Sequence, residues 1–309
     1  MKYTKLLFVT VMLAVMLVLG GGVLATSQAS PQGTLVIATT QDPGSWDPID
    51  TFYLSWGMVG SNIYDGLVDR SVDLKVGPGL ATSWEWVGEG YKRLRFHLRH
   101  GVKFQDGEPF NAEAVKFTFD RLLGPEGAKG PQQSNYTSID HVEIVDNYTV
   151  DFIMKKPDPV LITKLSGYGA MIVPPKYIQE KGDAYFDTHP VGTGPFEFVS
   201  YTRDDRLVLK ANPNYWGGTP KVAKVIYRFI PESSTRLAEL EAGHVDIMQG
   251  VQISQASVVK SKPNLQLLPV GSPTVVELRF DVSKPPADNV AFRQALNYAV
   301  DKQTIIDTI

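Results

Sequence analysis

Two histidines in the stretch RFHLRHGVKFQDGEPF, residues 95–110, are the side chains of this sequence that most suggest metal or acid–base chemistry. His97 and His100 are three positions apart, so on a β-strand they point to opposite faces. A zinc pair on a strand needs an even spacing and further His or Cys ligands. The sequence has no cysteine, and the other three of its 5 histidines are scattered singly. The pattern therefore favours a strand, a turn and a capped helix over a metal site.

Motifs of known enzyme classes are missing from the sequence as well. It has neither a G-x-S-x-G nucleophile elbow nor an H-E-x-x-H zinc motif. The glycine-rich VGTGPF at 191–196 lacks the Lys and Ser/Thr of a phosphate-binding loop, so we interpret it as a tight turn. The mixed-charge segment 203–206 is interpreted as a solvated hairpin tip. We expect no catalytic residue, no metal and no cofactor.

The secondary structure around the two histidines can be predicted from alternating apolar and polar residues and from turn and helix-capping residues. Apolar residues at 94, 96 and 98 alternate with polar ones, which predicts a strand with one buried face. Asp106-Gly107 predicts a turn, and Asn111 is a good N-cap for a helix over 112–123 that Gly124-Pro125 ends. A hairpin is predicted in 141–156. These elements indicate an antiparallel α+β region.

The rest of the chain alternates strands and helices, which indicates a mostly parallel α/β sheet. Strands are predicted at 33–40, 222–230, 245–248, 265–269 and 274–280, and helices at 54–68, 233–243, 253–260, 289–300 and 302–309. A short helix is expected to start at Pro175 and a further hairpin to lie in 191–216. Ser233 or Ser234 and Asp301 are the expected N-caps of the helices that follow them.

The N-terminal segment indicates export. Residues 1–29 combine two early lysines with an apolar run from Leu6 to Leu19 and end in a small-x-small pattern, which predicts a signal peptide cleaved after Ala29. A retained membrane anchor is the alternative. The net charge of −3 over 309 residues gives no drive toward nucleic acid. Without cysteine the protein cannot carry a lipid-modified N-terminal Cys.

The loop after the first strand is the best candidate for ligand contact. Its sequence QDPGSWDP is dense in turn residues and places Trp46 at the carboxyl end of a buried strand. In open α/β sheets, loops at this end of the strands line the ligand crevice.

Several stretches together resemble the family 5 extracellular solute-binding proteins, the peptide/nickel-binding receptors of ABC importers. The resemblance runs from about Thr34 to the last residue. It is carried, in order, by GLATSWEW…YKRLRFHLRHGVKFQDGEPFNAEAVKFTFDRLL, PVGTGPFEFVSYTRDDRLVLKANPNYWGG, IPESSTRLAELEAGHVDIM and FRQALNYAVDKQTII.

The resemblance implies a periplasmic-binding-protein-like α/β fold of two lobes that close on a ligand. Lobe I would comprise residues 30–65 and 191–273, with an α+β subdomain inserted at 66–190, and a truncated lobe II would start at 274 and run to 309. The loop whose backbone pairs with peptides in the family corresponds to Asp42, Pro43, Gly44, Ser45 and Trp46. Further expected ligand or hinge residues are Tyr136, Gln249, Gly250 and Thr274.

The expected function is an exported receptor, periplasmic or at the cell surface, that captures short peptides and delivers them to the permease of an ABC importer. At full length we expect a monomer that binds a peptide or small-molecule ligand and no nucleic acid. Nickel chelate or oligosaccharide receptors of the same class are alternatives. A secreted glycosidase-like enzyme, using carboxylates that no motif reveals, is the alternative of a different class.

Overall fold

The computed structural model describes residues 30–269, 277 and 279–308. Its internal contacts divide the described residues into two compact units, one formed by 30–35 and 42–226 and the other by 36–41 and the described residues from 227 onward. Among the described residues no helix is both long and apolar enough to cross a membrane. The predicted signal segment 1–29 lies outside the described residues.

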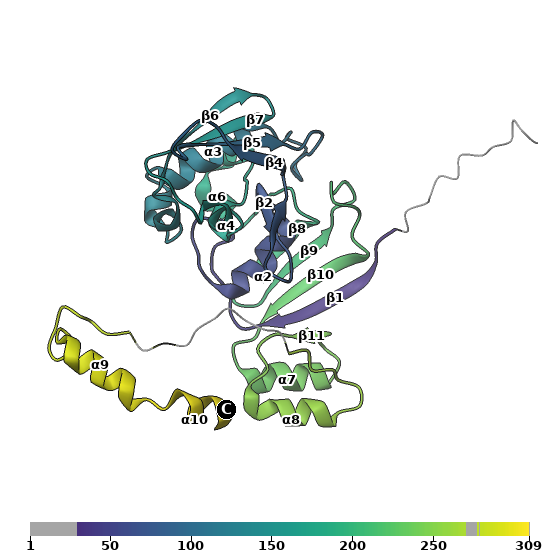
Figure 1. The fold of residues 1–309 in the computed structure, drawn as a ribbon. Coiled ribbons are helices and arrows are strands. Elements are labelled where there is room, and N and C mark those ends of the chain that lie inside the picture. Colours follow the sequence, from purple (N-terminus) through teal and green to yellow (C-terminus); the bar gives the residue numbers. More distant parts are fainter. Residues whose placement is uncertain (1–29, 270–276, 278, 309) are drawn as a thin grey trace, which may run out of the picture. The chain divides into compact units, whose positions relative to one another are not determined.

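The larger unit contains a four-stranded antiparallel sheet of order β4-β5-β7-β6 (Figure 1). Its strands are β4 (Ala81–Trp86), β5 (Arg93–Leu98), β6 (Ile139–Asp146) and β7 (Thr149–Met154). A two-stranded ribbon of β2 (Val68–Arg70) and β3 (Val76–Pro78) precedes them. The alternation predicted for 93–99 is confirmed, because Leu94, Phe96 and Leu98 are buried while their neighbours are not.

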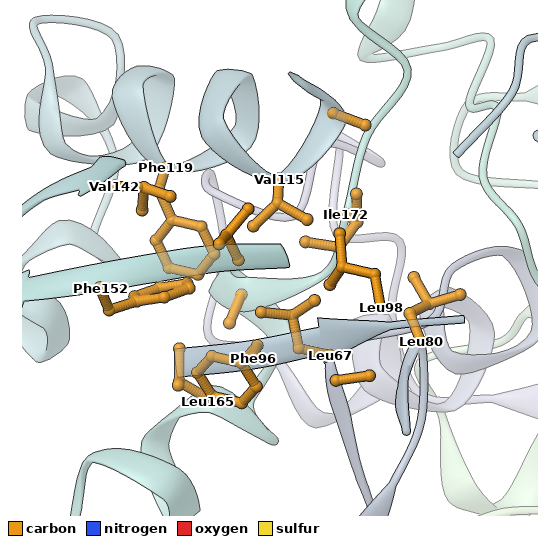
Figure 2. Packing of buried hydrophobic residues seen from close by; sticks show 14 of the residues in the cluster. Leu67, Leu80, Phe96, Leu98, Val115, Phe119, Val142, Phe152, Leu165 and Ile172 are labelled. Carbon is orange, nitrogen blue, oxygen red and sulfur yellow. The ribbon is translucent and has the colours of Figure 1, made fainter. Parts of the chain in front are cut away.

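One face of this sheet packs against helix α3 (Ala112–Leu123), where Val115 and Phe119 meet Phe96 and Phe152 (Figure 2). The Phe119 and Phe152 rings lie 4.7 Å apart in an edge-to-face arrangement, which favours the ring quadrupoles. The Asn111 side chain accepts a hydrogen bond of 3.2 Å from Ala114 N–H, so the predicted N-cap is confirmed.

Short helical segments complete the larger unit. They are α2 (Leu54–Ile63), the 3₁₀ turns η1 (Gly127–Lys129), η2 (Gln133–Tyr136) and η3 (Tyr168–Ala170), and the helices α4 (Leu161–Leu165), α5 (Pro175–Lys181) and α6 (Asp183–Phe186). Pro175 is the first residue of α5, as predicted.

A second sheet has the order β11-β1-β10-β9-β8. Its strands are β1 (Gln32–Thr39), β8 (Phe196–Thr202), β9 (Arg206–Ala211), β10 (Val222–Phe229) and β11 (Ile247–Met248). Strands β1 and β11 are parallel, while β8 and β9 form the antiparallel hairpin predicted for 191–216. The parallel character expected from the sequence therefore holds for part of this sheet, which is mixed.

The smaller unit holds α7 (Ser233–Glu241), α8 (Ile253–Ser261), α9 (Val290–Ala299) and α10 (Lys302–Thr308). Asp301 caps α10 as predicted, since its carboxylate accepts a 3.0 Å hydrogen bond from Thr304 N–H. The cap predicted for α7 is wrong: Glu232 occupies the N-cap position, and the Ser233 hydroxyl instead bonds to the Gln255 side chain at 2.7 Å.

The strand predicted at 265–269 is also wrong. The segment has no regular structure, although Leu265 and Leu267 pack against the core of the smaller unit formed around Ala38, Leu237 and Val259. Alternating leucines therefore reflect packing of an irregular segment here. The strand predicted at 274–280 lies mostly outside the described residues.

Candidate functional site

The loop that follows β1 is held in place by the carboxylate of Asp42. This carboxylate accepts hydrogen bonds from Gly44 N–H at 2.8 Å, from the Tyr201 hydroxyl at 2.6 Å and from Asp204 N–H at 2.7 Å. The first bond forms a local Asx turn, and the other two tie the loop to the β8–β9 hairpin. Gly44 has φ +81°, a left-handed conformation that glycine adopts without strain.

Ser45 and Trp46 fix the next part of the loop. The Ser45 hydroxyl donates to Asp50 at 2.8 Å and also lies 3.3 Å from an Asp187 carboxylate oxygen. The backbone of Trp46 donates to the Asp187 carbonyl and accepts from the Tyr64 hydroxyl, at 2.8 and 3.1 Å. The Trp46 ring is fully buried and meets the Tyr201 ring edge-on at 5.8 Å. Its bulk therefore anchors the loop in the core.

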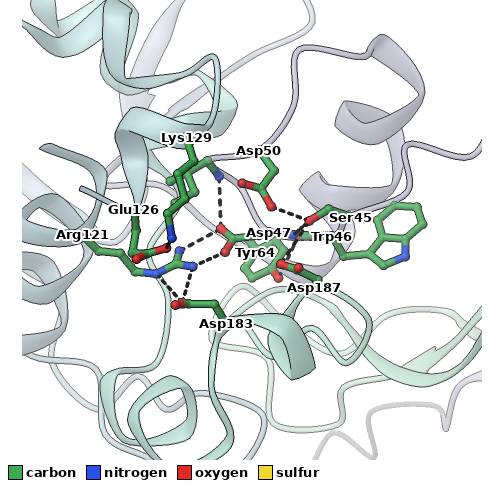
Figure 3. Close-up of polar contacts among 11 residues, drawn as sticks. Ser45, Trp46, Asp47, Asp50, Tyr64, Arg121, Glu126, Lys129, Asp183 and Asp187 are labelled. Atoms are coloured by element: carbon green, nitrogen blue, oxygen red, sulfur yellow. Dashed lines mark hydrogen bonds and ion pairs between the residues drawn. The ribbon is translucent and has the colours of Figure 1, made fainter. Parts of the chain in front are cut away.

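Asp47 ends the loop in an ion pair with Arg121 of α3. Figure 3 shows the Arg121 guanidinium between the carboxylates of Asp47 and Asp183, and Ser45 between those of Asp50 and Asp187. Burial raises the pKa of Asp47, and the pairing with Arg121 opposes this. Burial, together with the negative charges of Asp50 and Asp47, raises the pKa of Asp187 to about 6.

The carboxylates of Asp47, Asp50 and Asp187 offer oxygens that lie within 4.8 Å of one another, a spacing that could hold a metal ion. However, Arg121 binds both carboxylate oxygens of Asp47, and the Ser45 hydroxyl contacts the other two residues. The cluster therefore serves to anchor the loop.

The outer edge of the loop leaves backbone groups free. Within the described part of the chain, Ser45 N–H and the carbonyls of Pro43, Gly44 and Ser45 make no hydrogen bond. These residues are only partly buried, so the groups are satisfied by water or by a ligand. Such a backbone edge can pair with the main chain of an extended peptide.

An open pocket of 490 Å³ lies beside this edge. It is lined by Thr188, His189, Phe198, Val199, Ser200, Tyr201 and Arg203. Tyr201 links the pocket to the loop, because its hydroxyl bonds Asp42 and its ring packs on Trp46. The loop and the pocket together form the candidate site in the larger unit.

The match to a known protein family decides the class of the chain. Residues 75–309 match the model of the bacterial extracellular solute-binding proteins, family 5 Middle. The chain belongs to this family. Members of the family are binding proteins rather than enzymes, and the resemblance noted from the sequence is confirmed.

Relatives of the chain bind different solutes. Heme-binding protein A of Haemophilus influenzae is 32% identical over 92% of this chain and 56% of its own length. The dipeptide-binding protein of Escherichia coli is 31% identical over 95% of this chain and 59% of its own length. The solved dipeptide-binding protein of Pseudoalteromonas sp. SM9913 in complex with Met-Leu is 26% identical, with a TM-score of 0.78 over 90% of this chain and 59% of its own. The chain thus spans less than two thirds of these proteins.

The predicted site residues of this family 5 chain fall in separate places. Asp42 to Trp46 form one loop, but the Tyr136 side chain is buried in the antiparallel region, with its hydroxyl donating to the Lys164 carbonyl at 2.9 Å and its ring edge-on to Phe119. Thr274 lies outside the described residues. The contact of these residues with a ligand stays a prediction.

Gln249 and Gly250 belong to the smaller unit, where Arg236 organises them. The Arg236 guanidinium is 2% exposed and donates to four backbone carbonyls, those of Gln249, Gly250, Ile230 and Pro231, at 2.6–3.2 Å. The arginine thus joins the end of β10 to the segment after β11.

Sequence reasoning missed Tyr201, Arg203 and Asp187 as partners of the loop, and His189 as a residue of the pocket beside it. The solvated hairpin tip expected at 203–206 is confirmed, since Arg203, Asp204 and Arg206 are exposed, and the tip also lies against a loop about 160 residues earlier in the chain. No local pattern reports such a contact. The two histidines of the 95–110 stretch have structural neighbours: His97 lies 3.5 Å from Glu85, and His100 stacks on Tyr148.

Proposed function

We propose that this chain is the ligand-contacting part of an exported solute-binding receptor that captures short peptides for an ABC importer. The observation that supports it most directly is the free backbone edge at Pro43–Ser45, held in place by side chains on both flanks. Main-chain pairing gives affinity that depends little on the peptide's side chains. The dipeptide-binding relatives point to the same ligand class.

In this proposal the receptor has two lobes, with an α+β subdomain inserted at 66–190 and a second lobe that begins near residue 274. The lobes close on the peptide, and the closed form docks on a membrane permease. The receptor acts as a monomer in the periplasm or at the cell surface, and it binds its ligand without chemical turnover.

Calorimetry with a panel of solutes tests this proposal. The panel comprises a pool of di- to pentapeptides, hemin, a nickel–histidine complex and neutral oligosaccharides. We expect heat of binding with the peptide pool only. Binding of hemin, nickel–histidine or sugar without peptide binding would keep the receptor class and change the ligand. Turnover of a chromogenic glycoside would contradict the receptor class itself.

A further inference from the structure

The pocket beside the loop is lined by an exposed cation, Arg203, that has no ion-pair partner among the described residues. Arg203 lies on the β8–β9 turn and forms no ion pair or hydrogen bond with any described residue. Its neighbour Arg206 is different, because its guanidinium donates to Asp205 at 2.7 Å. The other lining residues of the pocket include one imidazole and no carboxylate. The pocket therefore offers a free positive charge.

The position of Arg203 places this charge at the loop. A Cβ built on Gly44 would lie 3.4 Å from an Nη atom of Arg203, so the guanidinium lies over the glycine. The acid nearest to this point along the loop, Asp42, already accepts hydrogen bonds from three donors, one at Oδ1 and two at Oδ2. A ligand ammonium group would find the Asp42 oxygens occupied, whereas a ligand carboxylate would find the planar fork of an arginine unoccupied.

Aromatic rings form the walls of the pocket. The His189 ring meets Phe198 edge-on at 5.3 Å and stacks on Tyr185 at 4.0 Å, which holds the imidazole in place. Tyr201 is fixed by its bond to Asp42. Flat walls of this kind suit an apolar or aromatic group, and the cation at the rim suits a carboxylate attached to it.

We propose that the pocket of His189, Phe198, Tyr201 and Arg203 is a subsite for a peptide residue that presents a carboxylate next to an apolar or aromatic group. Arg203 binds the carboxylate and acts as a specificity-determining residue, and the rings receive the neighbouring side chain. This inference rests on the proposed peptide-binding function, and it makes the receptor selective for an anionic ligand group at this end of the loop. The carboxylate is either the C-terminus of the peptide or an acidic side chain.

Nuclear magnetic resonance titration with three matched peptides tests the subsite and reaches weak affinities. The peptides are Ala-Ala-Phe, its C-terminal amide, and the amide of Ala-Glu-Phe. The signals followed are the side-chain Nε–H of Arg203 and the backbone amide of Ser45. The variants are Arg203→Gln, Arg203→Lys, which keeps the charge without the fork, and Arg206→Gln, a matched control that removes an already paired arginine of the same hairpin.

We expect the carboxylate peptide to bind about tenfold more tightly than Ala-Ala-Phe amide, the size of one hydrogen-bonded charge pair. This tenfold difference in affinity between the two peptides should disappear in Arg203→Gln, decrease in Arg203→Lys and remain in Arg206→Gln. Recovery of affinity by Ala-Glu-Phe amide assigns the subsite to an acidic side chain, and no recovery assigns it to the C-terminus. If Arg203→Gln still binds Ala-Ala-Phe more tightly than its amide, or if the parent binds the amide more tightly, the subsite is contradicted. Peptide binding itself is not contradicted by either result. Absence of any peptide binding overturns the proposed function and this inference with it.

Discussion

Arg121 and Asp47 form an ion pair from which solvent is almost fully excluded, with 7% and 1% of their side chains exposed. Arg121 lies in the last turn of α3 and Asp47 at the end of the loop that carries the candidate site, 74 positions earlier. The guanidinium spans both oxygens of the carboxylate. The helix that covers the antiparallel sheet therefore also fixes the loop, so folding of this region and formation of the site are coupled.

Replacing Arg121 by Met should lower the free energy of unfolding by about 3 kcal/mol, because it leaves the Asp47 carboxylate buried without its partner. Chemical denaturation measures this loss. The control is Lys116→Met, which removes an exposed ion pair with Asp120 on the same helix and should change stability by about 0.5 kcal/mol or less. Equal losses in the two variants would show that the Arg121 pair has no special role.

Asp187 should make stability depend on pH in a defined direction. Its pKa of about 6 lies above the usual aspartate value of 3.8, so the folded state holds the proton more tightly than the unfolded state. The resulting stability is present at pH 4 and is lost as the pH rises toward and through 6. Asp187→Asn, which stays neutral, should therefore be more stable than the parent at pH 7, with a smaller advantage at pH 4.

Denaturation of Asp187→Asn and its parent at several pH values between 4 and 7.5 measures this difference. The control, Asp205→Asn, removes an exposed carboxylate of the β8–β9 hairpin. An advantage of Asp187→Asn that is the same at every pH would speak against the assigned titration.

Tyr201→Phe should make the loop at residues 42–46 more mobile without creating a cavity in the core. The change removes the 2.6 Å bond to Asp42 but keeps the ring that packs on Trp46. We expect a loss of about 1–2 kcal/mol in unfolding free energy, since the bond joins a hydroxyl to a charged acceptor. Hydrogen exchange of the Gly44 amide should also accelerate. Tyr91→Phe, at a tyrosine that is 62% exposed, should change neither quantity.

Arg236→Met should destabilise the smaller unit, because four carbonyls lose their common donor, the buried guanidinium of Arg236. A loss of about 2 kcal/mol is expected, because the carbonyls of the half-buried Ile230 and Gln249 lose a charged donor, whereas water can reach those of the exposed Pro231 and Gly250. Arg228→Met, which removes a partly exposed pair with Glu239, should cost clearly less. Local hydrogen exchange at Gln249 and Gly250 reports the effect directly, and unchanged exchange in Arg236→Met would contradict the role assigned to the arginine.

Local signals in the sequence predicted the elements that depend on local forces. The alternation of Leu94, Phe96 and Leu98 follows from side-chain periodicity, and the cap at Asn111 follows from one hydrogen bond to a residue three positions later. The same reasoning failed at Ser233, whose hydroxyl found a partner on the next helix, and at Leu265 and Leu267, whose alternation reflects packing alone.

The site was only partly predictable for a related reason. The turn residues of the loop and its place after a strand pointed to Asp42–Trp46, and the family resemblance supported this choice. The link between the pocket and the loop was not predicted, since it depends on the Asp42–Tyr201 bond between positions 159 apart. Tyr136, also nominated by the resemblance, packs its ring in the core, and its contact with a ligand stays a prediction.

The pairing of a peptide main chain with the loop backbone is tested most directly at the Ser45 amide. The measurement is a titration of the ¹⁵N-labelled protein with trialanine and with trialanine methylated at its backbone nitrogens, which has lost its main-chain donors. We predict a saturable shift of the Ser45 and Gly44 amides with trialanine and a much weaker one with the methylated peptide. Equal shifts with both peptides, or binding that leaves residues 42–46 unmoved, would contradict the account.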